Sequence, residues 1–369
     1  MDSKTSLRVI HTESSINFGG QEMRILRQMR WLLDHAHESW LLARDSSAIY
    51  QEAQHLGLPC HPVAFRGSVN PLVTRAVQRF WHRHRADVLD CHSMRDASAV
   101  MPLSWLGYPI VHSQHICKRL KEDWMHRVIW RIGSRVTLAA SRSIADRLAE
   151  QRLVPPAHVR VVGEAVDLSV YRPDIDGSEI RRTWRIPPEA RLVTVVAMIR
   201  PDKAPHFLVR AAKRIALSIP QAWFMIVGAP TRPEFGEQLR AELAKSPVRD
   251  RIVLAGFQKQ VEQYMAASDV IAVTSTIEAQ SLVVPQAFAM KRVVVAPALG
   301  GIPELIQHGK TGYLYPPCDV EKLADTVVTA LQSDNTEILS RAYEFACRQL
   351  TMDSQMGLTL EIYGAAINR

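Results

Sequence analysis

The chain has 369 residues, which is too many for one ordinary core and fits two domains of roughly 150–180 residues each. Hydrophobic residues make up 47% and charged residues 22%, a globular composition that excludes a disordered chain. The five irregularly spaced cysteines form no zinc pattern, and no run reaches the roughly 18 apolar residues of a membrane span. We therefore expect a soluble, cytoplasmic protein with reduced thiols.

The net charge of +8 lies mostly in the first part of the chain. Residues 1–170 contain 22 Lys and Arg against 16 Asp and Glu, a difference of +6, and residues 171–369 contain 23 against 21, a difference of +2. A positive field of this kind attracts nucleic acid, anionic lipid or phosphorylated small molecules. Composition alone does not decide among these three kinds of partner.

The first half alternates short β-branched runs with helical stretches, such as the helix predicted for residues 21–35. Strands are predicted at 7–11, 39–43, 59–65, 87–91, 109–113, 135–140 and 159–163. After a polar, proline-bearing stretch at 171–191, the pattern restarts, with strands predicted at 192–198, 222–228, 251–256, 269–275, 292–297 and 311–316. Alternation of this kind predicts parallel sheets covered by helices on both faces.

The predicted fold is therefore α/β, with two Rossmann-like, doubly wound parallel-sheet domains facing a central cleft. We place an N-terminal domain at 1–170, a second at 171–345, and a helical segment at 346–369 that packs back towards the first. Ligands of such sheets bind beyond the carboxyl ends of the strands.

In the first half, Gly19 and Gly20 follow the first predicted strand in NFGGQEMRIL. Without side chains, their backbone N–H groups can approach an anion, and the alternative is a plain turn. The stretch lacks the G-x-G-x-x-G fingerprint of a dinucleotide site. Arg95 and Asp96 follow the fourth strand, where contact with an acceptor and a loop salt bridge are both open; His112 is expected to pack within its strand.

In the second half, chemistry-bearing residues again follow strands. Arg200 and Lys203 could meet phosphates, although surface cations are usually solvated. Glu278 could accept from sugar hydroxyls, and Gln286 could bond a ribose diol, the alternative being a capping acid and a surface glutamine. Gly300 and Gly301 form another backbone that lets a phosphate come close.

Taken in order, these stretches resemble the GT-B family 4 of retaining, nucleotide-sugar-dependent glycosyltransferases. The likeness runs through RPDK, FMIVGAP, VLAGF, YMAASDVIAVTS, the E-x7-acid motif and GGIPELIQHGKTGYLYPP, and in the first half through GGQEMR and PIVHSQHI. The sequence EAQS, where the family commonly has EGFG, is a departure that bears on the identity of the donor sugar.

The resemblance implies roles for individual residues. It makes His115, Glu278 and Gly20 catalytic, and assigns Gln286, which stands where the family has a second acid, to the ribose. It assigns the donor diphosphate to Gly19, Gly20, Arg200, Lys203, Gly300 and Gly301, and the donor-sugar loop to Glu278, Ala279, Gln280 and Ser281. The family's arginine would fall near Met198, so Arg200 is displaced by two positions.

The expected activity is transfer, with retention, of a sugar from a nucleotide-diphosphate donor to a glycan or lipid-linked acceptor, in lipopolysaccharide or surface polysaccharide synthesis. No cofactor or metal is expected beyond the co-substrate. The alternatives are a nucleotide-sugar epimerase on the same fold and a non-catalytic scaffold protein that binds nucleotide sugars.

Two basic segments with interleaved aromatics, 75–85 and 118–135, could rest on anionic lipid at the inner face of the cell membrane. The alternative is that their aromatics pack against the sheet and their basic faces are solvated. We expect no nucleic-acid partner, because the chain has no recognisable reading motif, and we expect a monomer or weak homodimer.

Overall fold

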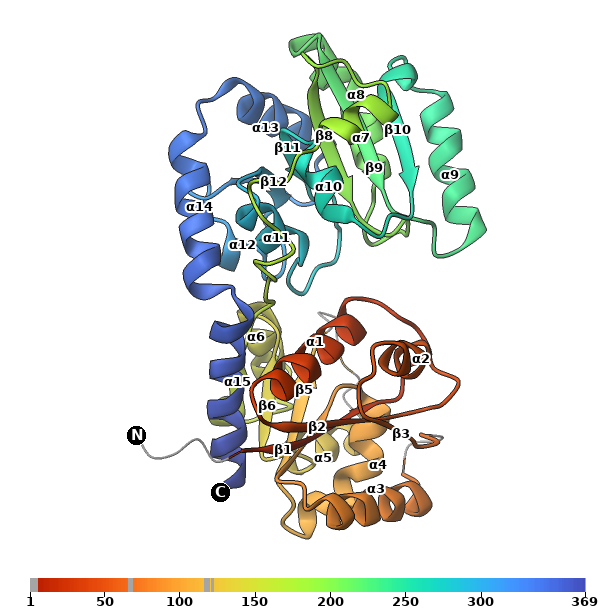
Figure 1. Cartoon of the computed structure of the whole chain (residues 1–369), viewed down its shortest axis with the longest axis vertical. Helices are drawn as coiled ribbons and strands as arrows, with labels where there is room; N and C mark the ends of the chain where they lie inside the picture. Colours follow the sequence, from red (N-terminus) through yellow and green to blue (C-terminus); the bar gives the residue numbers. More distant parts are fainter. Residues whose placement is uncertain (1–5, 66–68, 116–119, 121–122, 369) are drawn as a thin grey trace. The chain divides into compact units, whose positions relative to one another are not determined.

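The computed structural model describes residues 6–65, 69–115, 120 and 123–368 (Figure 1). The chain divides into two compact units: unit 1 is Met1–Glu164 with Met352–Arg369, and unit 2 is Ala165–Thr351. The sequence placed these divisions at residues 170 and 345, six residues too late and six too early.

Unit 1 contains a seven-stranded parallel sheet in the order β3-β2-β1-β4-β5-β6-β7. Its strands are β1 (Arg8–Glu13), β2 (Glu38–Ala43), β3 (Cys60–Pro62), β4 (Val88–Cys91), β5 (Ile110–Gln114), β6 (Val136–Ala139) and β7 (Val159–Val161). Its helices are α1 (Gly20–Asp34), α2 (Ala48–His55), α3 (Pro71–His84), α4 (Met94–Trp105), α5 (Trp124–Ile132), α6 (Arg142–Glu150), the 3-10 turn Pro156–His158 and the C-terminal α15 (Met352–Ile367).

Helices cover both faces of this sheet. Helices α3, α4 and α5 share one core with β4 and β5, whereas α1, α2 and α15 pack on the other face. Tyr363 of α15 is fully buried and its hydroxyl donates to Asp90 on β4 at 2.6 Å. The last helix of the chain is thus part of the core of unit 1.

Unit 2 contains a six-stranded parallel sheet in the order β10-β9-β8-β11-β12-β13. Its strands are β8 (Arg191–Val196), β9 (Ala222–Val227), β10 (Ile252–Gly256), β11 (Val270–Ala272), β12 (Val293–Pro297) and β13 (Tyr313–Tyr315). Its helices are α7 (Ser178–Thr183), α8 (His206–Ser218), α9 (Pro233–Ala244), α10 (Val261–Ala266), α11 (Val283–Ala289), α12 (Ile302–Leu305), α13 (Val320–Gln332) and α14 (Thr336–Gln349), with a 3-10 turn at Arg249–Arg251.

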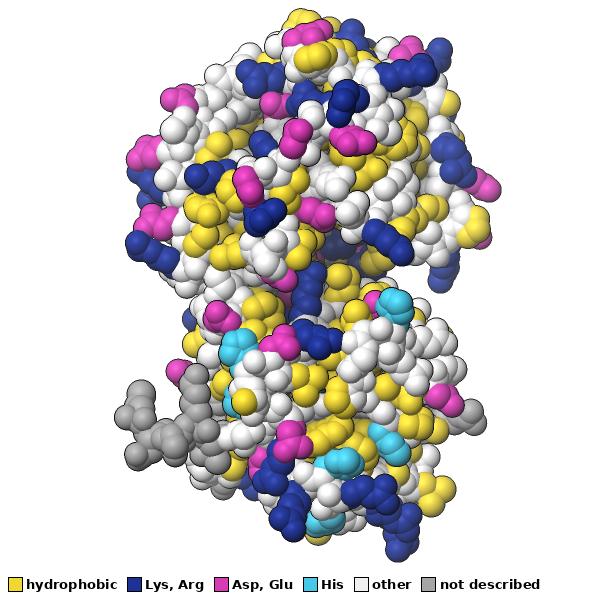
Figure 2. Space-filling view, in the orientation of Figure 1, with side chains coloured by type: hydrophobic (Ala, Val, Ile, Leu, Met, Phe, Trp, Pro, Cys, Tyr) yellow, Lys and Arg dark blue, Asp and Glu magenta, His cyan; other side chains and the backbone are white. Residues whose placement is uncertain are grey.

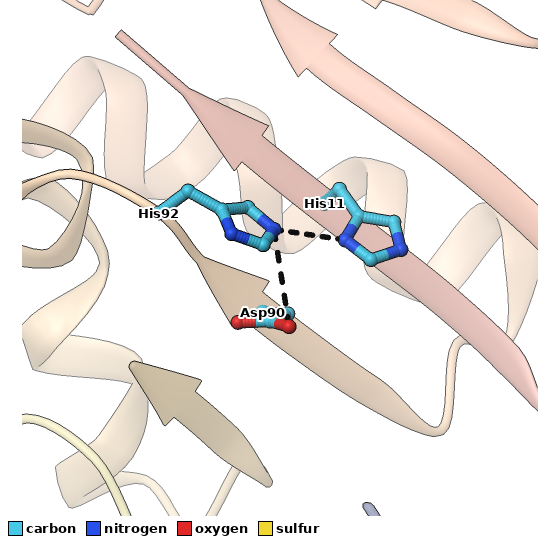
Figure 3. A group of neighbouring side chains, drawn as sticks. All are labelled: His11, Asp90 and His92. Atoms are coloured by element: carbon cyan, nitrogen blue, oxygen red, sulfur yellow. Dashed lines mark hydrogen bonds and ion pairs between the residues drawn. The ribbon is translucent and has the colours of Figure 1, made fainter. Parts of the chain in front are cut away.

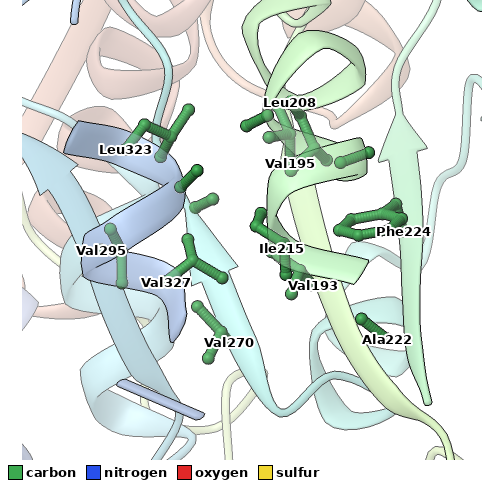
Figure 4. Packing of buried hydrophobic residues seen from close by; sticks show 14 of the residues in the cluster. Val193, Val195, Leu208, Ile215, Ala222, Phe224, Val270, Val295, Leu323 and Val327 are labelled. Carbon is green, nitrogen blue, oxygen red and sulfur yellow. The ribbon is translucent and has the colours of Figure 1, made fainter. Parts of the chain in front are cut away.

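The strands of unit 2 are apolar on both sides because each side meets helices. Val293 and Val295 of β12 pack with α8 and α13 in the core that Figure 4 shows, whereas Val294 and Ala296 pack with α11 and α14. Alternation of neighbouring residues between two cores is the pattern of a doubly covered parallel sheet. The two doubly wound parallel sheets predicted from the sequence are confirmed.

The aromatics of α3 differ from the membrane-facing arrangement expected for residues 75–85. Phe80 and Trp81 are buried against β4 and α4, while Arg75, Arg79 and Arg83 are exposed. The apolar residues of α3 recur at positions 73, 77, 80 and 81, one face of a helix, which explains why they pack inward. In the second segment Trp130 is also buried, and Lys118, Arg119 and Lys121 lie outside the described residues.

Within the described part of the chain, no helix combines the length and the apolar character that crossing a bilayer requires.

Candidate functional site

Three loops of unit 2 leave the carboxyl ends of β8, β11 and β12, which are neighbours in the sheet. Residues 197–205 follow β8, residues 273–282 follow β11, and residues 298–301 follow β12. Parallel strands place such loops at one edge of the sheet, where ligands of doubly wound folds bind. Lys203, Glu278 and Gly300 come from these three loops.

Lys203 and Glu278 form an ion pair in which Lys203 Nζ lies 2.6 Å from Glu278 Oε2. Ser275 Oγ donates to the same oxygen at 3.1 Å, and Thr274 Oγ1 donates to the carbonyl of Lys203 at 2.7 Å. The Lys203 side chain keeps 20% of its surface exposed and that of Glu278 keeps 9%. A cation held this way at a strand end can bind an anionic group that displaces or joins the carboxylate.

Gly300 fixes the loop after β12 against Glu278. Its φ is +57°, and a Cβ at this position would lie 1.9 Å from the carbonyl oxygen of Glu278. The next amide, of Gly301, donates to the carbonyl of Ala279 at 2.8 Å. Only glycine allows this close backbone approach, so the loop bearing Glu278 and the Gly-Gly loop are held as one surface.

We expect Gly300→Ala to lower the free energy of unfolding by about 3 kcal/mol, because it adds a backbone clash to the strain of a positive φ. The matched control is Gly309→Ala, with φ of +73° and nothing within 4 Å of the added Cβ, for which about 1 kcal/mol is expected. Urea unfolding of both variants measures the difference. Equal losses would show that Gly300 is not packed against Glu278.

The other predicted residues of unit 2 lie in the same loops or in the helix that follows the second of them. Arg200 Nε is 3.0 Å from Asp202 Oδ1, within the loop that carries Lys203. Gln286 is buried at 7% exposure in α11, which begins at Val283. Gln280 and Ser281 are also buried, between Glu278 and α11.

In unit 1, the glycine loop follows β1 and opens α1, with Gly19 at its N-cap. The N–H of Gly19 donates to Glu22 Oε2 at 2.8 Å, so this amide is engaged within the chain. The side-chain Nε2 of Gln21 donates to Glu13 Oε2, and burial raises the pKa of Glu13 to about 8. The loop is therefore anchored by two acids from its own surroundings.

Three histidines form a row across the ends of neighbouring strands β1, β4 and β5. His11 Nδ1 lies 2.9 Å from His92 Nε2, and His92 Nδ1 lies 3.0 Å from His115 Nε2. Asp90 lies beneath this row, with Oδ2 3.8 Å from His92 Nε2 (Figure 3). Burial lowers the pKa of all three histidines, that of His11 to about 3, so the imidazoles are neutral near pH 7.

Of this group, the sequence singled out His115 only by resemblance, and it missed His11 and Asp90. Both belong to predicted strands, where a single polar residue does not by itself indicate a functional site. The sequence does contain one signal for the three histidines: His11, His92 and His115 each lie at or just beyond the end of a predicted strand.

The two residues predicted for the acceptor side differ in exposure. Arg95 is exposed, whereas Asp96 is fully buried and accepts from Thr12 Oγ1 at 2.6 Å and from the N–H of His92 at 3.2 Å. Asp96 thus ties β1 to the start of α4 and has no surface to present to an acceptor. His112 is packed, stacked on Trp130 with ring centroids 4.2 Å apart.

A metal ion was not expected, but among the described residues one group has the geometry to hold one. His11, Asp90 and His92 each offer a ligand atom, and these atoms lie within 4.8 Å of one another. Both oxygens of Asp90 already accept hydroxyls, from Ser113 Oγ at 2.7 Å and from Tyr363. The 2.9 Å separation of the two ring nitrogens fits a hydrogen bond.

Comparison with known proteins identifies the family. The family model described as Glycosyltransferase Family 4 matches residues 18–170, and that described as Glycosyl transferases group 1 matches residues 189–333. A D-inositol 3-phosphate glycosyltransferase of Thermomonospora curvata is 30% identical over 289 residues, 70% of this chain and 67% of that protein. This chain belongs to glycosyltransferase family 4.

Other relatives match less of their own length. The protein of the same name from Mycobacteroides abscessus is 30% identical over 281 residues, which cover 71% of this chain and 61% of that protein. The match thus spans less than two thirds of that relative.

Solved structures show the same GT-B fold. A glycosyltransferase from Rickettsia africae has a TM-score of 0.87 at 17% identity, covering 99% of this chain and all of that one. HepE of Anabaena, crystallised with UDP and glucose, has a TM-score of 0.82 at 19% identity, covering 97% of this chain and 99% of that one. The family is one of transferase enzymes.

Proposed function

We propose that this chain is a retaining glycosyltransferase that moves a sugar from a nucleotide-diphosphate donor to a glycan or lipid-linked acceptor. The observation that carries the proposal is the Lys203–Glu278 pair, held against Gly300 at the carboxyl edge of the sheet of unit 2. The related structures of HepE contain UDP and UDP-glucose, which supports a nucleotide sugar as the donor.

In this proposal, Lys203 exchanges Glu278 for the diphosphate when the donor binds, before transfer begins, and is joined there by Arg200 and the backbone of the 300–301 loop. Fixed cations and amides stabilise charge that develops in the transition state without reorganising at that moment. Glu278 is then free to accept from hydroxyls of the donor sugar. Neutralisation by these groups makes the reaction independent of a divalent metal.

The proposed acceptor is a lipid-linked or surface glycan, as in lipopolysaccharide synthesis, at the cytoplasmic face of the membrane. The relatives' name points to a different acceptor, D-inositol 3-phosphate. Both acceptors are anionic when phosphorylated and would be drawn by the positive charge of residues 1–170.

The test is a transfer assay that crosses UDP-, GDP-, ADP- and CMP-sugars with D-inositol 3-phosphate and with lipid-linked glycans, after thermal-shift selection of the donor. Transfer with retained anomeric configuration, undiminished by a chelator, supports the proposal. Conversion of the donor without any acceptor would indicate an epimerase. Donor binding without turnover on any acceptor would indicate a non-catalytic scaffold.

Gln286 provides a graded test of donor binding. We expect Gln286→Glu to strengthen binding of the nucleotide sugar by about 1 kcal/mol, roughly a fivefold lower Kd, because a carboxylate forms charge-assisted hydrogen bonds with both ribose hydroxyls. Gln286→Ala, which removes the acceptor, should weaken binding. Calorimetric titration of both variants measures this, and a Gln286→Glu variant that neither binds nor turns over would remove Gln286 from the ribose site.

Membrane contact is proposed through the exposed cations of α3. Figure 2 shows Lys and Arg side chains gathered over the α3 end of unit 1, and Arg75, Arg79, Arg83 and Arg85 are exposed there. Because Phe80 and Trp81 are buried, the apolar contribution falls instead to Leu72, 79% exposed, and Trp124, 77% exposed. Flotation with anionic liposomes, but not with neutral ones, is the expected result; absence from both defeats this part of the proposal.

A further inference from the structure

The row of histidines in unit 1 has only two self-consistent proton arrangements. A neutral imidazole carries one N–H and one lone pair. With hydrogen bonds from His11 to His92 and from His92 to His115, the proton position on His92 dictates the positions on both neighbours. Either His115 carries its proton on Nδ1, or it carries it on Nε2 and presents a bare Nδ1.

Asp90 distinguishes these arrangements. Its carboxylate lies 3.8 Å from His92 Nε2, the nitrogen that also faces His11. Ser113 and Tyr363 each donate a hydroxyl hydrogen bond to Asp90, at 2.7 and 2.6 Å, an arrangement that suits the ionised carboxylate and counters part of the rise in pKa that burial causes. A negative charge beside Nε2 favours a proton on that nitrogen.

The consequence reaches His115 through two hydrogen bonds. With its proton on Nε2, His92 donates to His11 Nδ1 and accepts from His115 at Nδ1. His115 then carries its proton on Nε2, and its Nδ1 is a lone pair. This atom is buried and has no hydrogen-bond partner among the described residues.

The surroundings keep the row neutral. Arg24 of α1, held by the carbonyl of Val162 at 2.9 Å and by Glu164 at 3.3 Å, adds positive charge that disfavours protonation of His92 and His115. A neutral His115 with a bare Nδ1 cannot bind a phosphate oxygen, because it offers no proton there. It can accept a hydrogen bond from a hydroxyl.

We propose that Asp90 and His92 are positioning residues that lock His115 as the Nε2–H tautomer, so that its Nδ1 accepts a hydrogen bond from a sugar hydroxyl. The ligand class rests on the proposed function, whereas the tautomer is a property of the free protein. The C-terminal helix α15 contributes to this arrangement, because its residue Tyr363 donates a hydrogen bond that holds Asp90 in place.

The test is long-range proton–nitrogen NMR of the free, chelator-treated protein with ¹⁵N-labelled histidine, the His115 signals being those absent from His115→Asn. We expect a bare Nδ1 on His115 in the wild type. In Asp90→Asn, which removes the charge and keeps the shape, we expect the proton to move to Nδ1. Ser113→Ala removes one of the two hydroxyl donors but keeps the carboxylate and its hydrogen bond from Tyr363, so its tautomer should match the wild type.

An Nδ1 proton on wild-type His115, an unchanged tautomer in Asp90→Asn, or a metal ion found stoichiometrically at His11 and His92 before the chelator treatment would each overturn the proposal. Thermal unfolding confirms that the variants are folded. In the transfer assay, Asp90→Asn should lower kcat on the order of 10–100-fold with little change in KM for the donor. A correct tautomer in a protein that transfers no sugar would refute the proposed function and leave the tautomer lock standing.

Discussion

Replacing Lys203 by alanine is expected to lower kcat/KM for glycosyl transfer on the order of 10²–10³-fold, the cost of removing one preorganised group that meets developing charge. The effect has two parts. The departing diphosphate loses a fixed cation, and Glu278, only 9% exposed, is left without its partner at 2.6 Å. A buried carboxylate without a counter-ion repels the phosphates and destabilises its own loop.

Steady-state kinetics with the donor and acceptor from the transfer assay measure this loss. Lys203→Arg separates charge from shape and should recover part of the activity, because a guanidinium differs from an ammonium in geometry. The matched control is Arg210→Ala, which removes an equally positive side chain of unit 2 from an exposed pair with Glu242 and should change the rate less than about fivefold. A Lys203→Ala variant with the kinetics of this control would exclude Lys203 from the site.

Acid should destabilise the protein through His112, whose two ring nitrogens have no partner among the described residues. Burial lowers the pKa of His112 to about 3, from 6.5. Its folded-state pKa is thus depressed, so between these values the unfolded chain binds a proton that the folded chain rejects. The free energy of unfolding therefore falls as the pH falls below 6.5, by up to about 1.4 kcal/mol per pH unit.

The variant His112→Phe isolates this contribution, because phenylalanine keeps a ring against Trp130 and has nothing to titrate. Between pH 7 and pH 5 the wild type should lose about 2 kcal/mol relative to the variant. Urea unfolding at the two pH values measures the difference, with the exposed His55→Gln as control. A parallel pH dependence in wild type and His112→Phe would show that His112 is not buried as a neutral ring.

Glu13 contributes with the opposite sign. Its pKa is raised from 4.5 to about 8, so the folded chain holds a proton that the unfolded chain has lost. That stabilisation is complete below pH 4.5 and disappears as the pH rises through 8. The comparison with His112→Phe leaves this contribution unchanged in both proteins and so removes it from the difference.

The sheets could be predicted from the sequence because most strands are short apolar runs between helical stretches, many of them rich in Val and Ile, and parallel strands are apolar on both faces. The boundaries between the two units could not be predicted as closely as the strands. The division after Glu164 falls within a stretch that continues as loop, and α15 joins unit 1 through contacts such as that of Tyr363 with Asp90, which no local pattern reports.

The candidate site could be predicted in part for a similar reason. Lys203, Glu278 and Gly300 each follow a strand, so a parallel sheet brings them to one edge whatever the strand order. The row of histidines depends on the order β1-β4-β5, which places His11 and His92, 81 positions apart, side by side. The buried aromatics of α3 show a different limit of sequence-based prediction. Their basic neighbours suggested that they lie on the surface, whereas the helical spacing of the apolar residues places them in the core.

The most direct measurement of the central claim is a crystal structure of the protein with its nucleotide-diphosphate sugar. We predict that the diphosphate lies against Lys203 Nζ and the 300–301 loop, with Glu278 facing the sugar. A diphosphate bound elsewhere, with Lys203 still paired to Glu278 and turned away from it, would contradict the account.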